Sequence, residues 1–217
     1  MDVRITAIDP AGPDRRARRL VFDASDPRTT AAAAVKELGL TVDDVWSGDD
    51  LETALGEAES ALARDRALRM LGYRDRSTFE LASRLLADGY PQNVVDPLVV
   101  RLGALGLLDD ERFATGWVSS RRAAGVGRRK TRFELIQRGV SEQVADAVLA
   151  EAMPVEGEVD RARDLAHGTV LRTRRDRDRL MRRLVTRGFD LSTAARVAGE
   201  SDVLGESADA ADDLPIP

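Results

Sequence analysis

Cysteine is absent from this chain of 217 residues, and His167 is its one histidine. Without cysteine there can be no disulfide, no thiol nucleophile and no cysteine-ligated zinc. A single histidine without cysteine also argues against a histidine-based metal site and against a catalytic triad. We therefore predict that the protein has no metal, no cofactor and no enzymatic activity.

Aromatic residues are scarce, at 4% of the chain, and long apolar runs are missing. So few aromatics leave little material for stacking single-stranded bases. No stretch approaches the roughly 20 apolar residues that a membrane span needs. The first residues do not combine a basic segment with an apolar run, so we expect no signal peptide. The expected location is the cytoplasm.

Charged residues are abundant, at 33%, and their distribution is uneven around a net charge of −5. Residues 1–59 contain 7 Lys/Arg and 13 Asp/Glu, residues 60–190 contain 25 and 19, and residues 191–217 contain 1 and 6. A mildly basic centre therefore lies between acidic ends. It can be a solvated helical surface, or it can face a polyanion while the acidic ends limit promiscuous binding.

An internal repeat occupies this centre. Gly89, Gly139 and Gly188 are spaced 50 and 49 residues apart. Each has a leucine four positions before it, an apolar residue one position after it and another nine after it. In chain order these positions hold Leu85, Leu135 and Leu184, then Tyr90, Val140 and Phe189, then Leu98, Val148 and Val197. The repeat predicts structural modules in tandem.

Helix signals within each repeat are consistent with a pair of helices joined at the glycine. Twelve positions before the glycines lie the candidate N-caps Ser77, Gly127 and Asp176. Second helices are expected at 92–104, 142–152 and 191–199, and earlier amphipathic helices at 58–72, 110–123 and 157–167. We predict a mainly α fold of three three-helix modules in an elongated, curved tandem array.

The two ends of the chain differ from the centre. Period-two alternation in Val3–Ile8 and Arg18–Asp23 predicts a small hairpin, followed by a helix near 29–38. The last residues are acidic and rich in Ala, Asp and Pro, which predicts disorder. The expected organisation is an N-terminal extension (1–55), three modules (56–106, 107–154 and 155–199) and an acidic tail (200–217).

Several motifs in the repeat resemble the RecX family. The first module contains Ala67-Leu68-Arg69-Met70-Leu71 and Gly89-Tyr90. The stretch Leu105–Ala114 resembles the family's most recognisable segment. Gly125-Val126-Gly127 before a basic cluster, and Arg187-Gly188-Phe189, resemble the second and third modules. The resemblance covers about residues 58–198.

Membership of this family implies binding rather than chemistry. Family members bind the RecA nucleoprotein filament and suppress its strand exchange, ATP hydrolysis and coprotease functions, which links them to DNA repair and the SOS response. The resemblance implies that the RecA filament is the partner. Weak binding to single-stranded or duplex DNA is a further expectation, and we expect no membrane partner. We expect a monomer.

The strongest candidate for a binding surface is a basic cluster around the Gly125–Gly127 turn. It contains Arg121, Arg122, Arg128, Arg129, Lys130 and Arg132. Anions would be attracted by these side chains and by the dipole of the helix that starts there. A solvated junction is an equally good interpretation. Arg172, Arg174 and Arg175 begin a second cluster, in which Asp176 and Asp178 favour intrahelical ion pairs.

Two other motifs have structural interpretations. Asp109-Asp110-Glu111 is best read as helix capping, because the spacing of a calcium loop does not follow. Gly125-x-Gly-x-x-Lys130 lacks the spacing and the strand of a phosphate loop. Trp117 and Phe113, four residues apart, are expected in the core.

The main rival hypothesis is a direct DNA-binding regulator. The glycine-linked helix pairs would then act as helix-turn-helix-like recognition elements. The acidic total charge and the modest excess of positive charge in the centre argue against it.

Overall fold

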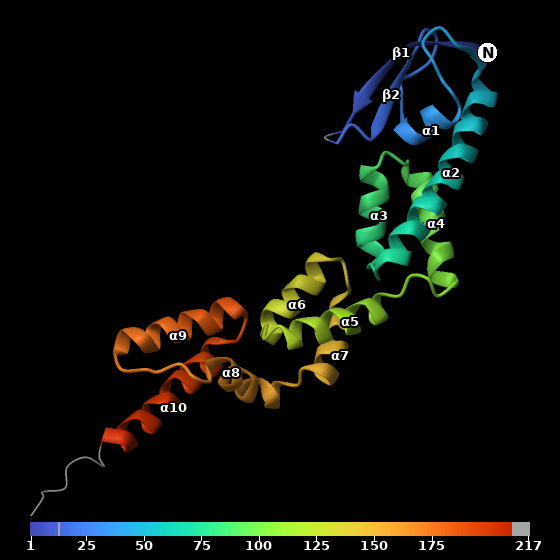
Figure 1. The fold of residues 1–217 in the computed structure, drawn as a ribbon. Coiled ribbons are helices and arrows are strands. Elements are labelled where there is room, and N and C mark those ends of the chain that lie inside the picture. Colours follow the sequence, from blue (N-terminus) through green and yellow to red (C-terminus); the bar gives the residue numbers. More distant parts are fainter. Residues whose placement is uncertain (13, 210–217) are drawn as a thin grey trace, which may run out of the picture. The chain divides into compact units, whose positions relative to one another are not determined.

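The computed structural model describes residues 1–12 and 14–209 (Figure 1). The chain divides into two units, Met1–Asp110 and a second that begins at Glu111. The predicted mainly helical fold with a small N-terminal sheet is confirmed. Among the described residues, no helix is long and apolar enough to cross a membrane.

The N-terminal extension is a four-stranded antiparallel sheet with order β3-β2-β1-β4, where sequence predicted only a hairpin. Its strands are β1 (Asp2–Ala11), β2 (Ala17–Phe22), β3 (Arg28–Ala31) and β4 (Val45–Ser47). The helix expected near 29–38 starts later, as α1 (Ala32–Glu37), because residues 28–31 pair with β2. The local helix signal at residues 29–31 is thus overridden by pairing with the preceding strand.

Helix α2 (Gly48–Tyr73) connects the sheet to the first module. It begins ten residues before the predicted 58, because Leu51 and Leu55 are buried in the core formed with Ile5 and Leu20 of the sheet. Further along, Ala63, Ala67 and Met70 pack into the core of the first module. The predicted boundary at residue 55 therefore lies inside one continuous helix.

The first module consists of α2 with α3 (Thr78–Ala87) and α4 (Gln92–Ala104), which lie together in Figure 1. The hydroxyl of Ser77 accepts a hydrogen bond from the Glu80 backbone N–H, so the predicted cap is confirmed. Gly89 has a φ of +95°, and a Cβ there would lie 2.7 Å from the Cβ of Ala17. The turn glycine therefore lets the helix pair approach the sheet closely.

The second module consists of α5 (Asp110–Ala123), α6 (Arg128–Gln137) and α7 (Glu142–Ala152). The predicted ranges 110–123 and 142–152 are confirmed. Its core contains Phe113, Val118, Leu135 and Leu149, with Trp117 half-buried against it. The expected core position of the two aromatics is thus confirmed for Phe113 and holds in part for Trp117.

The third module follows a short 3₁₀ turn, η1 (Val155–Gly157), and consists of α8 (Glu158–Ala166), α9 (Arg174–Arg187) and α10 (Leu191–Asp209). The N-cap of α9 is Thr173 and not the predicted Asp176. Asp176 is instead the third helical residue, whose carboxylate completes a capping box. Phe189, Leu184 and Val197 lie in the core of this module.

The end of α10 differs from the prediction. The helix continues to Asp209, so residues 200–209 are helical where the sequence predicted disorder. Once a helix is nucleated, each added residue gains a hydrogen bond, and polar residues do not stop it. The rest of the predicted acidic tail, residues 210–217, lies outside the described residues.

Candidate partner-binding surface

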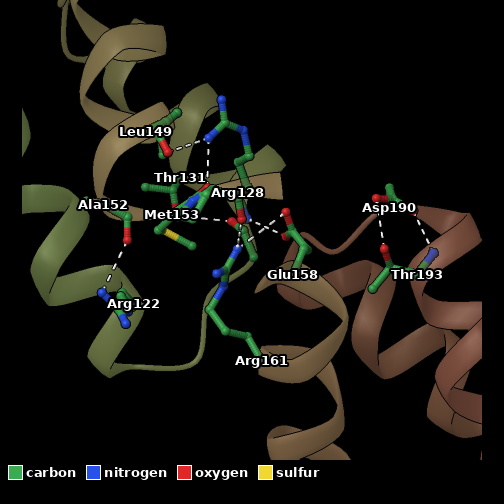
Figure 2. Close-up of polar contacts among 12 residues, drawn as sticks. Arg122, Arg128, Thr131, Leu149, Ala152, Met153, Glu158, Arg161, Asp190 and Thr193 are labelled. Carbon is green, nitrogen blue, oxygen red and sulfur yellow. Dashed lines mark hydrogen bonds and ion pairs between the residues drawn. The ribbon is translucent and has the colours of Figure 1, made fainter. Parts of the chain in front are cut away.

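At the N-terminus of α6, where the basic cluster was predicted, three backbone N–H groups donate to groups of the third module. The Gly127 backbone N–H donates to the Arg187 carbonyl at 2.9 Å, and the Arg129 N–H donates to the Gly188 carbonyl at 3.2 Å. Between them, the Arg128 N–H donates to the buried Glu158 carboxylate at 2.9 Å (Figure 2). Three of the amides that the predicted dipole site would offer to an external anion are therefore already bound within the protein.

Arg128 has a structural role in this arrangement. Figure 2 shows its guanidinium directed at the end of α7, where it donates to the carbonyls of Leu149 and Met153. The Leu149 carbonyl also accepts from the backbone N–H of Met153, the C-cap residue of α7, at 3.0 Å. A cation at a helix C-terminus also interacts favourably with the helix dipole. Arg128 thus joins α6 to α7.

Arg132 and Arg121 are also paired internally. Arg132 binds Asp146 at 2.6 Å and Glu142 at 2.9 Å, and these two carboxylates raise the pKa of its guanidinium. Arg121 lies 2.7 Å from the Glu134 carboxylate and stacks on Trp117, 4.2 Å from the ring centroid. Arg122 is exposed, and its guanidinium donates to the Ala152 carbonyl at 3.3 Å.

The remaining predicted residues are exposed. Across the described part of the chain, none of them has an ion pair or a side-chain hydrogen bond. These residues are Arg129, Lys130, Arg172, Arg174 and Arg175. Their guanidinium and ammonium groups are therefore available to a partner.

The exposed cations form two groups at opposite ends of α9. Arg129 and Lys130 lie beside Gly188, where a Cβ would come 2.2 Å from the Lys130 Cβ. Arg174 begins α9, 14 residues long, so it lies about 20 Å from that end at 1.5 Å per residue. One of the intrahelical pairs expected in α9 forms between Arg179 and Asp176, whose charged atoms are 3.9 Å apart.

The acidic motif Asp109-Asp110-Glu111 contains a helix-capping residue. The Asp110 carboxylate accepts a hydrogen bond from the Thr78 backbone N–H at 2.7 Å, so it caps α3. Within residues 1–12 and 14–209, no group of three or more acidic or histidine side chains is arranged to hold a metal ion.

Comparison with known proteins identifies the family. The model described as "RecX, first three-helix domain" matches residues 63–102, and "RecX, second three-helix domain" matches residues 109–149. The regulatory protein RecX of Mycobacterium marinum is 40% identical over 142 residues, which cover 62% of this chain and 82% of that protein. The RecX of Mycolicibacterium smegmatis is 35% identical over 161 residues, which cover 70% and 84%. The chain belongs to the RecX family.

Solved structures agree with this RecX fold. A crystal structure of regulatory protein RecX superposes with a TM-score of 0.60 at 21% identity, and covers 90% of this chain and 98% of that one. RecX from Lactobacillus salivarius gives a TM-score of 0.59 at 18% identity, and covers 67% and 97%. At these identities the likeness concerns the fold alone.

Two acidic residues of this RecX chain organise the arginines, and sequence reasoning missed both. Glu158 holds the N-terminus of α6, and Asp88 pairs with Arg16, Arg66 and Arg84. Asp88 lies one residue before a repeat glycine, but its partners come from the residue before β2, from α2 and from α3. Only the position of Arg84 four residues earlier was visible as a sequence signal.

Proposed function

We propose that this RecX-family protein binds the RecA nucleoprotein filament and inhibits its recombinase, ATPase and coprotease activities, and so modulates DNA repair and the SOS response. It acts by binding and performs no chemistry itself. The observation that supports this most directly is family membership, since the relatives at 35–40% identity are named regulatory protein RecX.

The exposed cations of the second unit are the proposed contact surface. Arg129 and Lys130 form one group, and Arg172, Arg174 and Arg175 form the other. Two groups separated by about 20 Å can contact separate anionic points on an extended polymer. Arg128 and Arg132 support this surface indirectly, because they hold α6 against α7.

The test is ATP hydrolysis by the cognate RecA on single-stranded DNA, titrated with this protein. Wild-type protein should inhibit at well below one molecule per RecA protomer. The double reversal Arg129→Glu and Lys130→Glu should raise the half-inhibiting concentration at least tenfold, about 1.4 kcal/mol of binding free energy. Arg128 is left intact, since its loss would disturb α7.

The matched control is Arg101→Glu, a charge reversal at an exposed arginine of α4 in the first unit. It should inhibit as the wild type does. Equal inhibition by a folded Arg129→Glu, Lys130→Glu variant would show that this group is not the contact surface. Absence of inhibition by the wild type would contradict the proposed function itself.

The same preparation tests direct DNA binding, the rival hypothesis. Tight, salt-sensitive binding to duplex DNA without RecA, together with no effect on ATP hydrolysis, would favour a helix-turn-helix-like DNA regulator. The glycine-linked pairs α3–α4 and α6–α7 would then be the elements to mutate.

A further inference from the structure

A hollow of about 420 Å³ lies between α2 and α3 in the first unit. Its lining has no acidic side chain. It consists of Arg66, Arg69, Met70, Tyr73, Arg76 and Arg84. Met70 is buried and Tyr73 is 85% exposed, so the hollow has an apolar side and an aromatic rim. Its volume is within the range of small-ligand sites.

Positive charge in the hollow exceeds the negative charge beside it. Arg66 and Arg84 pair with Asp88, at 2.9 and 3.3 Å, but the same carboxylate also binds Arg16 at 2.8 Å. Arg69 and Arg76 have no ion pair with any residue that the structure describes. Two of the four guanidinium groups therefore share the Asp88 carboxylate with Arg16, and the other two have no ion pair among the described residues.

Arg76 is the least satisfied of the four. Its Nε is buried and has no hydrogen-bond partner among the described residues. Burial lowers the pKa of its guanidinium, and the neighbouring charges of Arg74, Arg66 and Arg84 lower it further, although Glu80 opposes them. A buried donor without an acceptor costs free energy. An anion in the hollow would offset the repulsion between the Arg76 guanidinium and its cationic neighbours.

We propose that this hollow binds a phosphate group of a nucleic-acid backbone. Guanidinium groups match phosphate oxygens in geometry and charge, and several can share one phosphate. The exposed ring of Tyr73 favours nucleic acid over an acidic peptide, because a base can stack on it next to the bound phosphate. This site goes beyond the proposed function, since it lies in the first unit and needs no recombinase.

The experiment measures fluorescence anisotropy of a labelled oligothymidylate with the full chain and no RecA. The variant Arg69→Gln, Arg76→Gln should weaken binding about tenfold per arginine. The slope of the logarithm of affinity against the logarithm of salt concentration should become shallower by about one for each phosphate contact removed. Tyr73→Ala should weaken binding by about tenfold, because a base loses its stacking face.

Arg101→Gln is the matched control, an exposed arginine of the same unit outside the hollow. Its affinity should equal that of the wild type, and all variants should keep the wild-type melting curve. Calorimetry with inorganic phosphate gives a second readout, in which the wild type releases heat and Arg69→Gln, Arg76→Gln does not.

Three results would overturn the proposal. The first is an equal loss in Arg101→Gln, which would indicate a diffuse electrostatic effect. The second is binding of inorganic phosphate without any effect of the variants on the oligonucleotide, which would exclude a nucleic-acid source. The third is displacement of the oligonucleotide by an oligoglutamate peptide more readily than by unlabelled oligonucleotide. None of these readouts depends on RecA, so failure here leaves the proposed function standing.

Discussion

The Glu158 carboxylate accepts a hydrogen bond from the backbone N–H of Arg128, 30 residues earlier, at 2.9 Å. The N-cap residue of α6 is Gly127, which has no side chain to provide this bond. The first residue of α8 thus caps the first turn of α6 and joins the second module to the third. A negative charge at this point also complements the dipole of α6.

Replacing Glu158 should destabilise the second unit. In Glu158→Ala the Arg128 N–H loses its acceptor, and Arg161, 3.7 Å away, loses its carboxylate. We expect a fall of about 2 kcal/mol in the free energy of unfolding, the cost of a buried hydrogen bond to a charged group. Glu158→Gln, which keeps an acceptor, should lose less.

Urea unfolding followed by Trp117 fluorescence measures this change in a Trp46→Phe background, where Trp117 is the one tryptophan. Glu151→Ala, a change at an exposed glutamate of α7, is the control and should alter stability by less than about 0.5 kcal/mol. Equal stability of Glu158→Ala and this control would contradict the capping role.

Gly188 should tolerate no side chain. Its φ is +97°, and an added Cβ would lie 2.2 Å from the Lys130 Cβ and 2.8 Å from the Lys130 backbone N. Gly188→Ala should therefore cost more than the 1–2 kcal/mol or so of left-handed backbone strain alone. Because α6 would have to move, the amides of Gly127 and Arg129 should lose protection from hydrogen exchange.

Gly168→Ala is the control that measures backbone strain without a steric clash. Gly168 has a φ of +76° and open space around the position of an added Cβ. This substitution should therefore lower the free energy of unfolding by the backbone strain alone. If both substitutions cost the same, the close approach of α9 to α6 has no energetic consequence.

Asp190 should contribute to the loss of folding stability at acidic pH. Its carboxylate accepts hydrogen bonds from the Thr193 backbone N–H and the Ser192 hydroxyl, both at 2.7 Å, and these bonds lower its pKa. A carboxylate with a lowered pKa in the folded state stabilises the fold fully above its unfolded pKa, about 3.9. That stabilisation is lost as the pH falls below the pKa of the unfolded state and through the lower pKa of the folded state.

Asp190→Asn should therefore reduce stability at pH 7 and flatten the loss of stability below about pH 4. The measurement is the melting temperature of each protein across pH 2 to 7, a window set by that pKa. Asp164→Asn serves as the reference, because the exposed Asp164 side chain makes no bond within the described residues. Parallel pH profiles for Asp190→Asn and wild type would contradict this role.

The sequence by itself determined the repeated helix pairs. Apolar spacing and the glycines at 89, 139 and 188 act within a few residues, so the ranges 92–104, 110–123 and 142–152 matched the structure. The N-cap Ser77 was predictable for the same reason. The family-like motifs were readable too, and they led to the RecX assignment.

Only the tertiary structure decided which arginines are available to a partner. Arg128 and Arg129 are adjacent in sequence, yet the guanidinium of Arg128 binds carbonyls of α7 while that of Arg129 is exposed. The partners of Arg128 and Arg66 lie more than 20 residues away along the chain. The spacing of residues along the chain does not predict such pairs. Ion pairs and close contacts between distant residues depend on how the helices pack and not on helix propensity.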